Sequence, residues 1–120
     1  MTLPLDQFLY FHNPRCSKSR AALALLRERG VEPQLIDYLG HPPSEAEIGQ
    51  LLALLGLEPR QLMRSHEPEY AAAGLGDPSL DRAALIRALH QYPKLIERPI
   101  FVANGKAVIG RPPERVLEIL

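Results

Sequence analysis

The chain has 120 residues, with 14 Lys or Arg and 14 Asp or Glu, so its formal net charge is zero with His neutral. This length fits one domain, and the balanced charge offers no basic face of the kind that nucleic-acid binding requires. No apolar stretch is long enough to span a membrane, and residues 1–6 lack the features of a signal peptide. With a single Cys, these features suggest a reducing compartment. We therefore expect a cytoplasmic monomer that binds neither nucleic acid nor membrane.

The first part of the chain predicts a strand, a helix and a second strand. Residues 7–11 contain a near-continuous apolar run, typical of a buried strand. Residues 17–29 are rich in Ala and Leu at helical spacing, and Gly30 suits the position after the helix end. Residues 33–38 predict the second strand. Strands joined by a helical crossover of this length run parallel.

The middle of the chain predicts a helical insertion over about residues 44–92. Ser44 and Glu47 have the spacing of a capping box, and apolar residues then recur at helical spacing as far as Gly56. Pro59 predicts the start of a short helix. Residues 66–76 predict another short helix, and residues 81–90 predict a longer one that stops before the next proline.

The last part returns to strands. Residues 100–103 and 106–109 are apolar and flank Asn-Gly, which favours a type I′ hairpin turn. Two prolines, at 112 and 113, then open a C-terminal helix. The order is β-α-β, helices, β-β-α, which predicts an α/β fold with a mixed four-stranded sheet. We interpret residues 1–120 as a single thioredoxin-like domain with the helical insertion at about 44–92.

The only cysteine lies in the string HNPRCSKSR at residues 12–20, between the first strand and the first helix. This position puts Cys16 at or just before the helix N-terminus. Free backbone N–H groups and the helix dipole favour a thiolate there, and the same groups can bind an oxyanion. Arg15, Lys18 and Arg20 add positive charge, and His12 adds more when it is protonated. A lone Cys is commonly a small buried hydrophobe, but these neighbours favour a reactive thiolate beside an anion site.

Several other cysteine and histidine motifs are absent from the sequence. Ser19 completes C-x-x-S rather than C-x-x-C, so the chain has no resolving cysteine and forms no internal disulfide. Ala22 stands where a cysteine phosphatase loop requires Arg. His66-Glu67 does not continue as H-E-x-x-H, and we expect no metal site. We expect His41, His66 and His90 on the surface.

The string at residues 12–20 resembles the active-site loop of the glutaredoxin-coupled arsenate reductase family. Three further motifs occur in the order found in that family: Leu62-Met63-Arg64, Glu97-Arg98-Pro99-Ile100 and Ile109-Gly110-Arg111-Pro112. The resemblance covers about residues 8–120 and is strongest to the arsenate reductase-like branch. It implies a thioredoxin-like fold and reduction of arsenate to arsenite, a step in arsenic detoxification. It also implies glutathione as co-substrate, glutaredoxin as partner and no bound cofactor.

The resemblance assigns roles to particular residues. Cys16 is the nucleophile, and His12 supports its thiolate. For Ser19 the C-x-x-S spacing is the basis, since it puts the hydroxyl one helical turn on, where it can donate a hydrogen bond to the thiolate. Three arginines bind the oxyanion and stabilise the transition state: Arg64, Arg98 and Arg111. Guanidinium suits this task because it stays charged and bonds two oxygens of a tetrahedral anion at once. Pro99 is structural, and we predict that the Arg98–Pro99 bond is cis, as is usual at this point of thioredoxin-like folds.

Taken residue by residue, other interpretations stay open. Each arginine alone is most often a solvated surface charge. His12 can cap the strand end, and Ser19 can satisfy the backbone at the helix start. Two other functions also fit the chain. One is a glutathione-linked thiol oxidoreductase that acts on another substrate. The other is an Spx-like regulator that binds RNA polymerase, although such regulators commonly carry the C-x-x-C that Ser19 removes.

Overall fold

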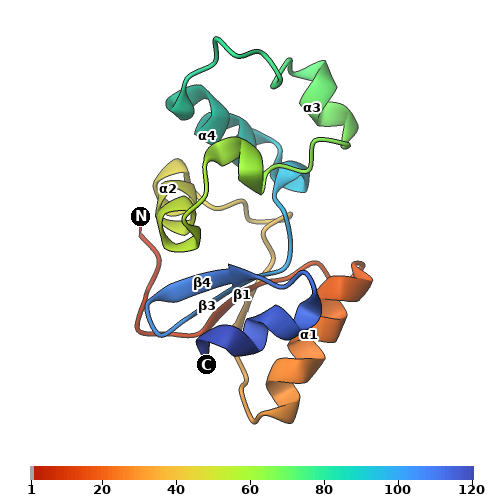
Figure 1. Cartoon of the computed structure of the whole chain (residues 1–120), viewed down its shortest axis with the longest axis vertical. Coiled ribbons are helices and arrows are strands. Elements are labelled where there is room, and N and C mark those ends of the chain that lie inside the picture. Colours follow the sequence, from red (N-terminus) through yellow and green to blue (C-terminus); the bar gives the residue numbers. More distant parts are fainter. Residues whose placement is uncertain (1) are drawn as a thin grey trace. The chain divides into compact units, whose positions relative to one another are not determined.

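The computed structural model describes residues 2–120, and it shows an α/β chain built as two compact units (Figure 1). We call Leu3–His41 together with Arg98–Leu120 the sheet unit, and Pro42–Glu97, with Thr2, the helical unit. No helix within residues 2–120 combines the length and apolarity needed to cross a membrane. The interpretation of residues 1–120 as a single domain stays a prediction.

The sheet unit contains a mixed four-stranded sheet in the order β2-β1-β3-β4. Strand β1 (Leu9–Phe11) pairs in parallel with β2 (Gln34–Ile36) and antiparallel with β3 (Ile100–Ala103). Strand β3 forms an antiparallel hairpin with β4 (Lys106–Ile109). The predicted mixed sheet is therefore confirmed. The second strand is shorter than residues 33–38: it begins after Pro33, which has no N–H for the ladder, and it ends at Ile36.

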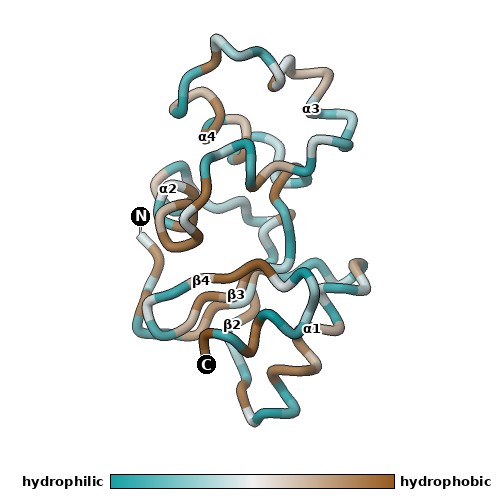
Figure 2. The backbone as a smooth tube through the Cα atoms, in the orientation of Figure 1, coloured by the Kyte–Doolittle hydropathy of each residue, from teal (hydrophilic) through white to brown (hydrophobic). Residues whose placement is uncertain are grey.

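Two helices complete the core of the sheet unit. Helix α1 (Ser17–Glu28) packs against the 3₁₀-helix η3 (Pro113–Ile119), which also packs on β4. Figure 2 shows how strongly apolar β3 and β4 are. Fully burying one large apolar side chain contributes roughly 1.5–3 kcal/mol, so this cluster is the main source of stability in the unit. Its buried members are Tyr10, Ala22, Leu23, Leu26, Phe101, Ala103, Val108 and Val116.

Local turn and cap signals account for the element boundaries. Gly30 follows α1 at φ +75°, a left-handed conformation that costs glycine little. Asn104 and Gly105 connect β3 to β4 at φ 55° and 72°, the positive values that a type I′ turn requires. Pro112 caps η3 and Pro113 is its first residue, so the predicted C-terminal helix is confirmed, although it is 3₁₀ in type.

The helical unit forms the elements that the sequence predicts between residues 44 and 92. Ser44 and Glu47 make both bonds of a capping box, with N···O distances of 3.1 and 2.9 Å. The first and last of the three α-helices pack together through buried Leu and Ile side chains. The elements are α2 (Glu45–Leu55), η1 (Pro59–Leu62), α3 (Pro68–Ala72), α4 (Arg82–Gln91) and η2 (Pro93–Leu95).

A short antiparallel bridge between Met63 and Ile96 closes the helical unit. The N–H of Arg64 donates to the carbonyl of Leu95 at 2.7 Å, and the N–H of Glu97 donates to the carbonyl of Leu62 at 2.8 Å. The bridge thus fixes the backbone at Arg64.

The histidines outside the cysteine loop differ in exposure. His41 and His66 are exposed, as predicted. His90 is half-buried, and its Nδ1 hydrogen-bonds the carbonyl of Pro43 at 2.8 Å.

Candidate active site

Cys16 lies at the N-cap of α1, with an extended backbone at φ −92° and ψ 122°. Its N–H donates to the carbonyl of Asn13 at 2.9 Å, and its carbonyl accepts from the N–H of Arg20 at 3.0 Å. These bonds close the loop tightly onto the helix. The residue is 9 % exposed. The sulfur therefore sits where the unpaired N–H groups of the first helical turn favour negative charge.

Arg111 approaches Cys16 from the end of the hairpin. Its Nη2 lies 3.9 Å from the Cys16 Sγ, and its Nε donates to the carbonyl oxygen of Arg98 at 2.8 Å. The Arg98–Pro99 bond is cis, as predicted, and the Arg111–Pro112 bond is cis as well. Arg98 precedes β3 and Arg111 follows β4, so the hairpin brings these two residues to the same end of α1.

The guanidinium of Arg98 has an unusual environment. Its Nε is buried and has no hydrogen-bond partner among the described residues. A buried donor left unpaired costs about 1–3 kcal/mol. An acceptor that reached this N–H would remove that cost.

Ser19 lies one turn into α1 and is fully buried. Its hydroxyl oxygen accepts from the N–H of Asn13 at 3.1 Å and lies 2.7 Å from Nδ1 of His12. Which of the two groups donates in the second contact depends on the tautomer of the His12 ring. The hydroxyl thus joins the loop to the helix, while its predicted bond to the Cys16 thiolate stays a prediction.

Burial lowers the pKa of His12 below its usual value, and the charges of Arg27 and Arg20 lower it further. His12 is therefore neutral at pH 7. A protonated His12 would add positive charge beside Cys16, but the partly desolvated ring and the two guanidinium groups disfavour that form.

Tyr10 supports the same network and was not a candidate from the sequence, where it resembles an ordinary core residue. Its hydroxyl donates to the carbonyl of Ser19. Burial is the main cause that raises the pKa of Tyr10 to about 12, so the hydroxyl keeps its proton and remains a donor at neutral pH.

Arg64 belongs to the helical unit, and acidic neighbours from that unit hold it. Its Nη1 donates to Glu67 at 2.6 Å, and its Nη2 lies 3.1 Å from Nε2 of His66. The carboxylate of Glu97 lies 3.9 Å from its Nε. Sequence reasoning missed both glutamates. Only 14 % of the Arg64 side chain is exposed, which excludes the solvated-charge interpretation. Its role toward the oxyanion stays a prediction.

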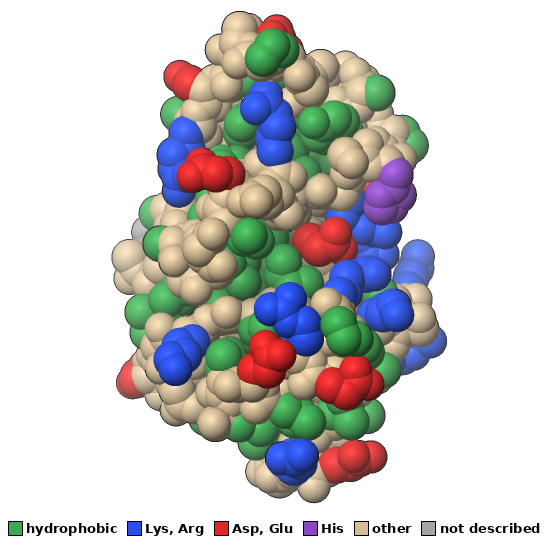
Figure 3. Space-filling model, in the orientation of Figure 1, with side chains coloured by type: hydrophobic (Ala, Val, Ile, Leu, Met, Phe, Trp, Pro, Cys, Tyr) green, Lys and Arg blue, Asp and Glu red, His purple; other side chains and the backbone are tan. Residues whose placement is uncertain are grey.

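The surface around the cysteine loop is basic. Arg15, Lys18 and Arg20 are exposed, and no Asp or Glu occurs anywhere between residues 7 and 27. Figure 3 shows Lys and Arg side chains gathered over the N-terminal end of α1. Within residues 2–120, no group of three or more His, Cys, Asp or Glu side chains could hold a metal ion. The chemical resources of the site are therefore a thiol, amide N–H groups and guanidinium groups.

These features define a thioredoxin-like α/β protein with one cysteine at the start of its first helix. The sequence profile of the ArsC family matches residues 11–119, and the chain belongs to this family. It is 55% identical over 115 residues to the uncharacterized protein YfgD of Escherichia coli (strain K12), covering 95% of this chain and 97% of that protein. It is 50% identical over 117 residues to an arsenate reductase of Neisseria meningitidis (serogroup B, strain MC58), covering 97% and 100%. The structure of an arsenate reductase from Vibrio cholerae matches at a TM-score of 0.92 and 50% identity, covering 100% of this chain and 98% of that chain.

Proposed function

We propose that the protein reduces arsenate to arsenite, with the Cys16 thiolate as nucleophile and glutathione as the electron donor. The observation that carries the proposal is the approach of the Arg111 guanidinium to 3.9 Å from the Cys16 sulfur at a helix N-terminus. Membership of the ArsC family and the arsenate reductases at 50% identity support it. They do not favour a different substrate or an RNA polymerase-binding regulator.

Positive charge and free donors suit the site to arsenate. The buried Nε of Arg98 lacks a partner, and an arsenate oxygen would supply one. Arg111 adds a second guanidinium, whose Nη2 lies 3.9 Å from the Cys16 sulfur, and the first turn of α1 adds backbone N–H groups. We include Arg64 as the third cation, on the resemblance of its motif. Charges aimed at the oxygens stabilise the negative charge that develops in the transition state.

The proposed chemistry proceeds in two stages. The Cys16 thiolate first attacks arsenic, an S–As bond forms, and one protonated arsenate oxygen leaves as water. The thiolate of glutathione then attacks the adduct. The two sulfur atoms together give up two electrons, so As(V) becomes As(III), and arsenite leaves as the sulfurs join in a disulfide. Glutaredoxin reduces that disulfide and returns Cys16 to the thiol form.

Cys16 is the only cysteine, so the second sulfur comes from another molecule. This is the reason for proposing glutathione and glutaredoxin rather than an internal dithiol. Both work in a compartment that keeps thiols reduced, which for this proposal is the cytoplasm. No bound cofactor is part of the scheme.

The test is arsenate reduction by the purified protein with glutathione and glutaredoxin. We expect Cys16→Ser to abolish turnover. We expect Arg98→Ala and Arg111→Ala each to lower kcat/KM by about 10²–10³-fold, the usual effect of removing one oxyanion donor. Arg115→Ala is the matched control, because Arg115 is an exposed arginine that pairs with Glu118. Turnover that persists in Cys16→Ser would refute the proposal.

A further inference from the structure

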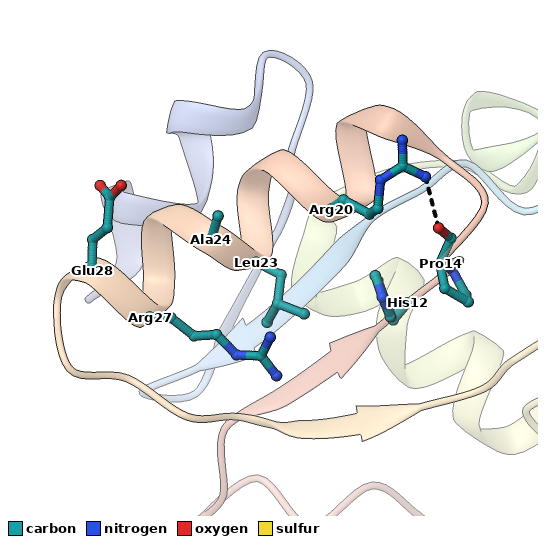
Figure 4. A pocket seen from close by; sticks show the side chains of 7 residues that line it. All are labelled: His12, Pro14, Arg20, Leu23, Ala24, Arg27 and Glu28. Carbon is teal, nitrogen blue, oxygen red and sulfur yellow. Dashed lines mark hydrogen bonds between the residues drawn. The ribbon is translucent and has the colours of Figure 1, made fainter.

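An open pocket of about 620 Å³ lies along α1, next to the loop that carries Cys16. His12 and Pro14 of the loop line it, together with one face of the helix (Figure 4). Its volume is in the usual range for sites that bind small molecules. The thiol chemistry proposed above does not use this pocket.

The helix contributes a regular pattern to the pocket. Arg20, Leu23, Ala24 and Arg27 all line it, and their spacing of i, i+3, i+4 and i+7 puts them on one helical face. The two arginines are seven residues apart, which is about 10 Å along a helix axis. The pocket is therefore lined by two arginines, with Leu23 and Ala24 between them along the helix.

The hydrogen bonds of the arginines fix where the charges lie. Nη1 of Arg20 donates to the carbonyl of Pro14 at 2.8 Å, which holds this guanidinium beside the cysteine loop (Figure 4). Arg27 uses Nε and Nη2 on the carboxylate of Glu32, at 3.0–3.1 Å, so its Nη1 is not used by that pair. Both arginines therefore keep N–H donors for a ligand.

The electrostatic environment of the pocket favours an anion. Arg27 and Arg20 both lower the pKa of His12, so the charges of both reach the loop side of the pocket. Glu28 is the only acidic residue that lines it, and Figure 4 shows its carboxylate turned away from the other side chains.

We propose that this pocket binds the peptide part of glutathione, with one carboxylate at Arg20 and the other near Arg27. This inference rests on the proposed function, because it places the second thiol of that reaction. Glutathione carries a carboxylate at each end, and the pocket offers two arginines that can receive them. With the glycine carboxylate at Arg20, which bonds Pro14 of the cysteine loop, the cysteine of the ligand is one residue away from that loop.

A binding experiment tests the pocket without turnover. S-methylglutathione cannot react, so we titrate it into ¹⁵N-labelled protein and follow the amide signals by NMR. We expect saturable shifts at Leu23, Ala24 and Arg27, and much weaker binding of the diethyl ester, which lacks free carboxylates. Arg27→Gln should weaken binding by about tenfold, the loss of about one charge-assisted bond. The control Arg29→Gln, an exposed neighbour outside the pocket, should bind as wild type. Equal binding of acid and ester, or shifts confined to other elements, would overturn the inference.

A kinetic experiment separates this inference from the proposed function. With glutathione as donor, we expect Arg27→Gln to raise the KM for glutathione about tenfold and leave the KM for arsenate unchanged. With 2-mercaptoethanol, which has no carboxylate, the variant should match wild type. Glu32→Gln frees Arg27 and should lower the KM for glutathione. If the KM for glutathione is unchanged in Arg27→Gln, or if only the KM for glutaredoxin changes, glutathione does not bind in this pocket. If the wild-type protein reduces no arsenate with either thiol, the proposed function is wrong. The NMR titration still tests whether the pocket binds S-methylglutathione.

Discussion

Ser19 is the residue on which the local geometry of the cysteine loop depends. Its buried hydroxyl bonds both His12 and the N–H of Asn13. We predict that Ser19→Ala lowers the free energy of unfolding by about 1–3 kcal/mol, because it leaves a loop N–H without its partner. Urea denaturation measures the change. Ser17→Ala, at an exposed position in the same helical turn, should change the free energy by less than about 0.5 kcal/mol. An equal effect of the two substitutions would contradict the proposed role of the hydroxyl.

His12 gives the protein a pH dependence whose sign follows from its environment. Burial and two guanidinium groups lower its pKa below the usual 6.5, so the unfolded chain binds this proton at higher pH than the folded chain. Stability from this group is complete above 6.5 and falls as the pH drops from 6.5 toward the folded pKa. When the pH is lowered from about 7.5 to about 5.5, we expect the free energy of unfolding to fall less in His12→Gln than in wild type.

The control for His12 is the exposed His41. Urea midpoints of His41→Gln should show the same pH difference as wild type. Titration of the ring signals by NMR provides a second measurement, in which the His12 ring should titrate below 6.5. A His12 signal that titrates at or above 6.5 would contradict the assigned environment.

At the scale of elements, Gly110 lies directly after β4, where an added Cβ would meet Pro99, η3 and α1. A Cβ at this position would lie 2.9 Å from Cγ of Pro99 and 3.1 Å from Cγ1 of Val116. We predict that Gly110→Ala lowers the free energy of unfolding by about 1–3 kcal/mol, the usual cost of overpacking. It should also lower arsenate reduction, because the next residue is Arg111. Gly49→Ala is the matched control.

Gly49 lies inside α2 with nothing within 4 Å of an added Cβ. The same substitution there should raise the free energy of unfolding by about 0.5–1 kcal/mol, through helix propensity. Thermal or urea denaturation of both variants provides the comparison. A loss of stability in Gly49→Ala, or no loss in Gly110→Ala, would contradict the prediction. The space around the added Cβ would then not determine the change in the free energy of unfolding.

The elements with local causes could be predicted from the sequence. The Asn104-Gly105 turn and the Ser44 capping box depend on residues at most three apart, so their patterns suffice. The contacts of the site depend on residues far apart in the chain. Nothing near Cys16 in sequence indicates that Arg111, 95 positions later, lies 3.9 Å from its sulfur; only the family motif pointed to it. The lowered pKa of His12 depends on the burial and the two arginines that the fold supplies.

At the scale of the whole molecule, net charge is a poor guide to what the chain binds. The total is zero, yet residues 7–27 contain four Lys or Arg and no Asp or Glu. This segregation places basic side chains over the start of α1 (Figure 3). A balanced total keeps long-range attraction to nucleic acid weak, while the local field can still attract a small anion. The sequence therefore supports selectivity for a compact oxyanion over a polyanion.

Anion binding should stabilise the whole molecule, because a ligand that binds only the folded state shifts the unfolding equilibrium. Sulfate is a tetrahedral anion that the thiol cannot reduce, so it reports binding alone. At 100 times its Kd it should add about 2.7 kcal/mol, and a chain of this size gains about 4 °C in Tm per kcal/mol. We expect this rise in wild type and its loss in Arg111→Gln, while the exposed-arginine control Arg115→Gln keeps it. Equal rises in both variants would show that sulfate acts on the solvent or on another surface, and the anion site at Cys16 would then lack support.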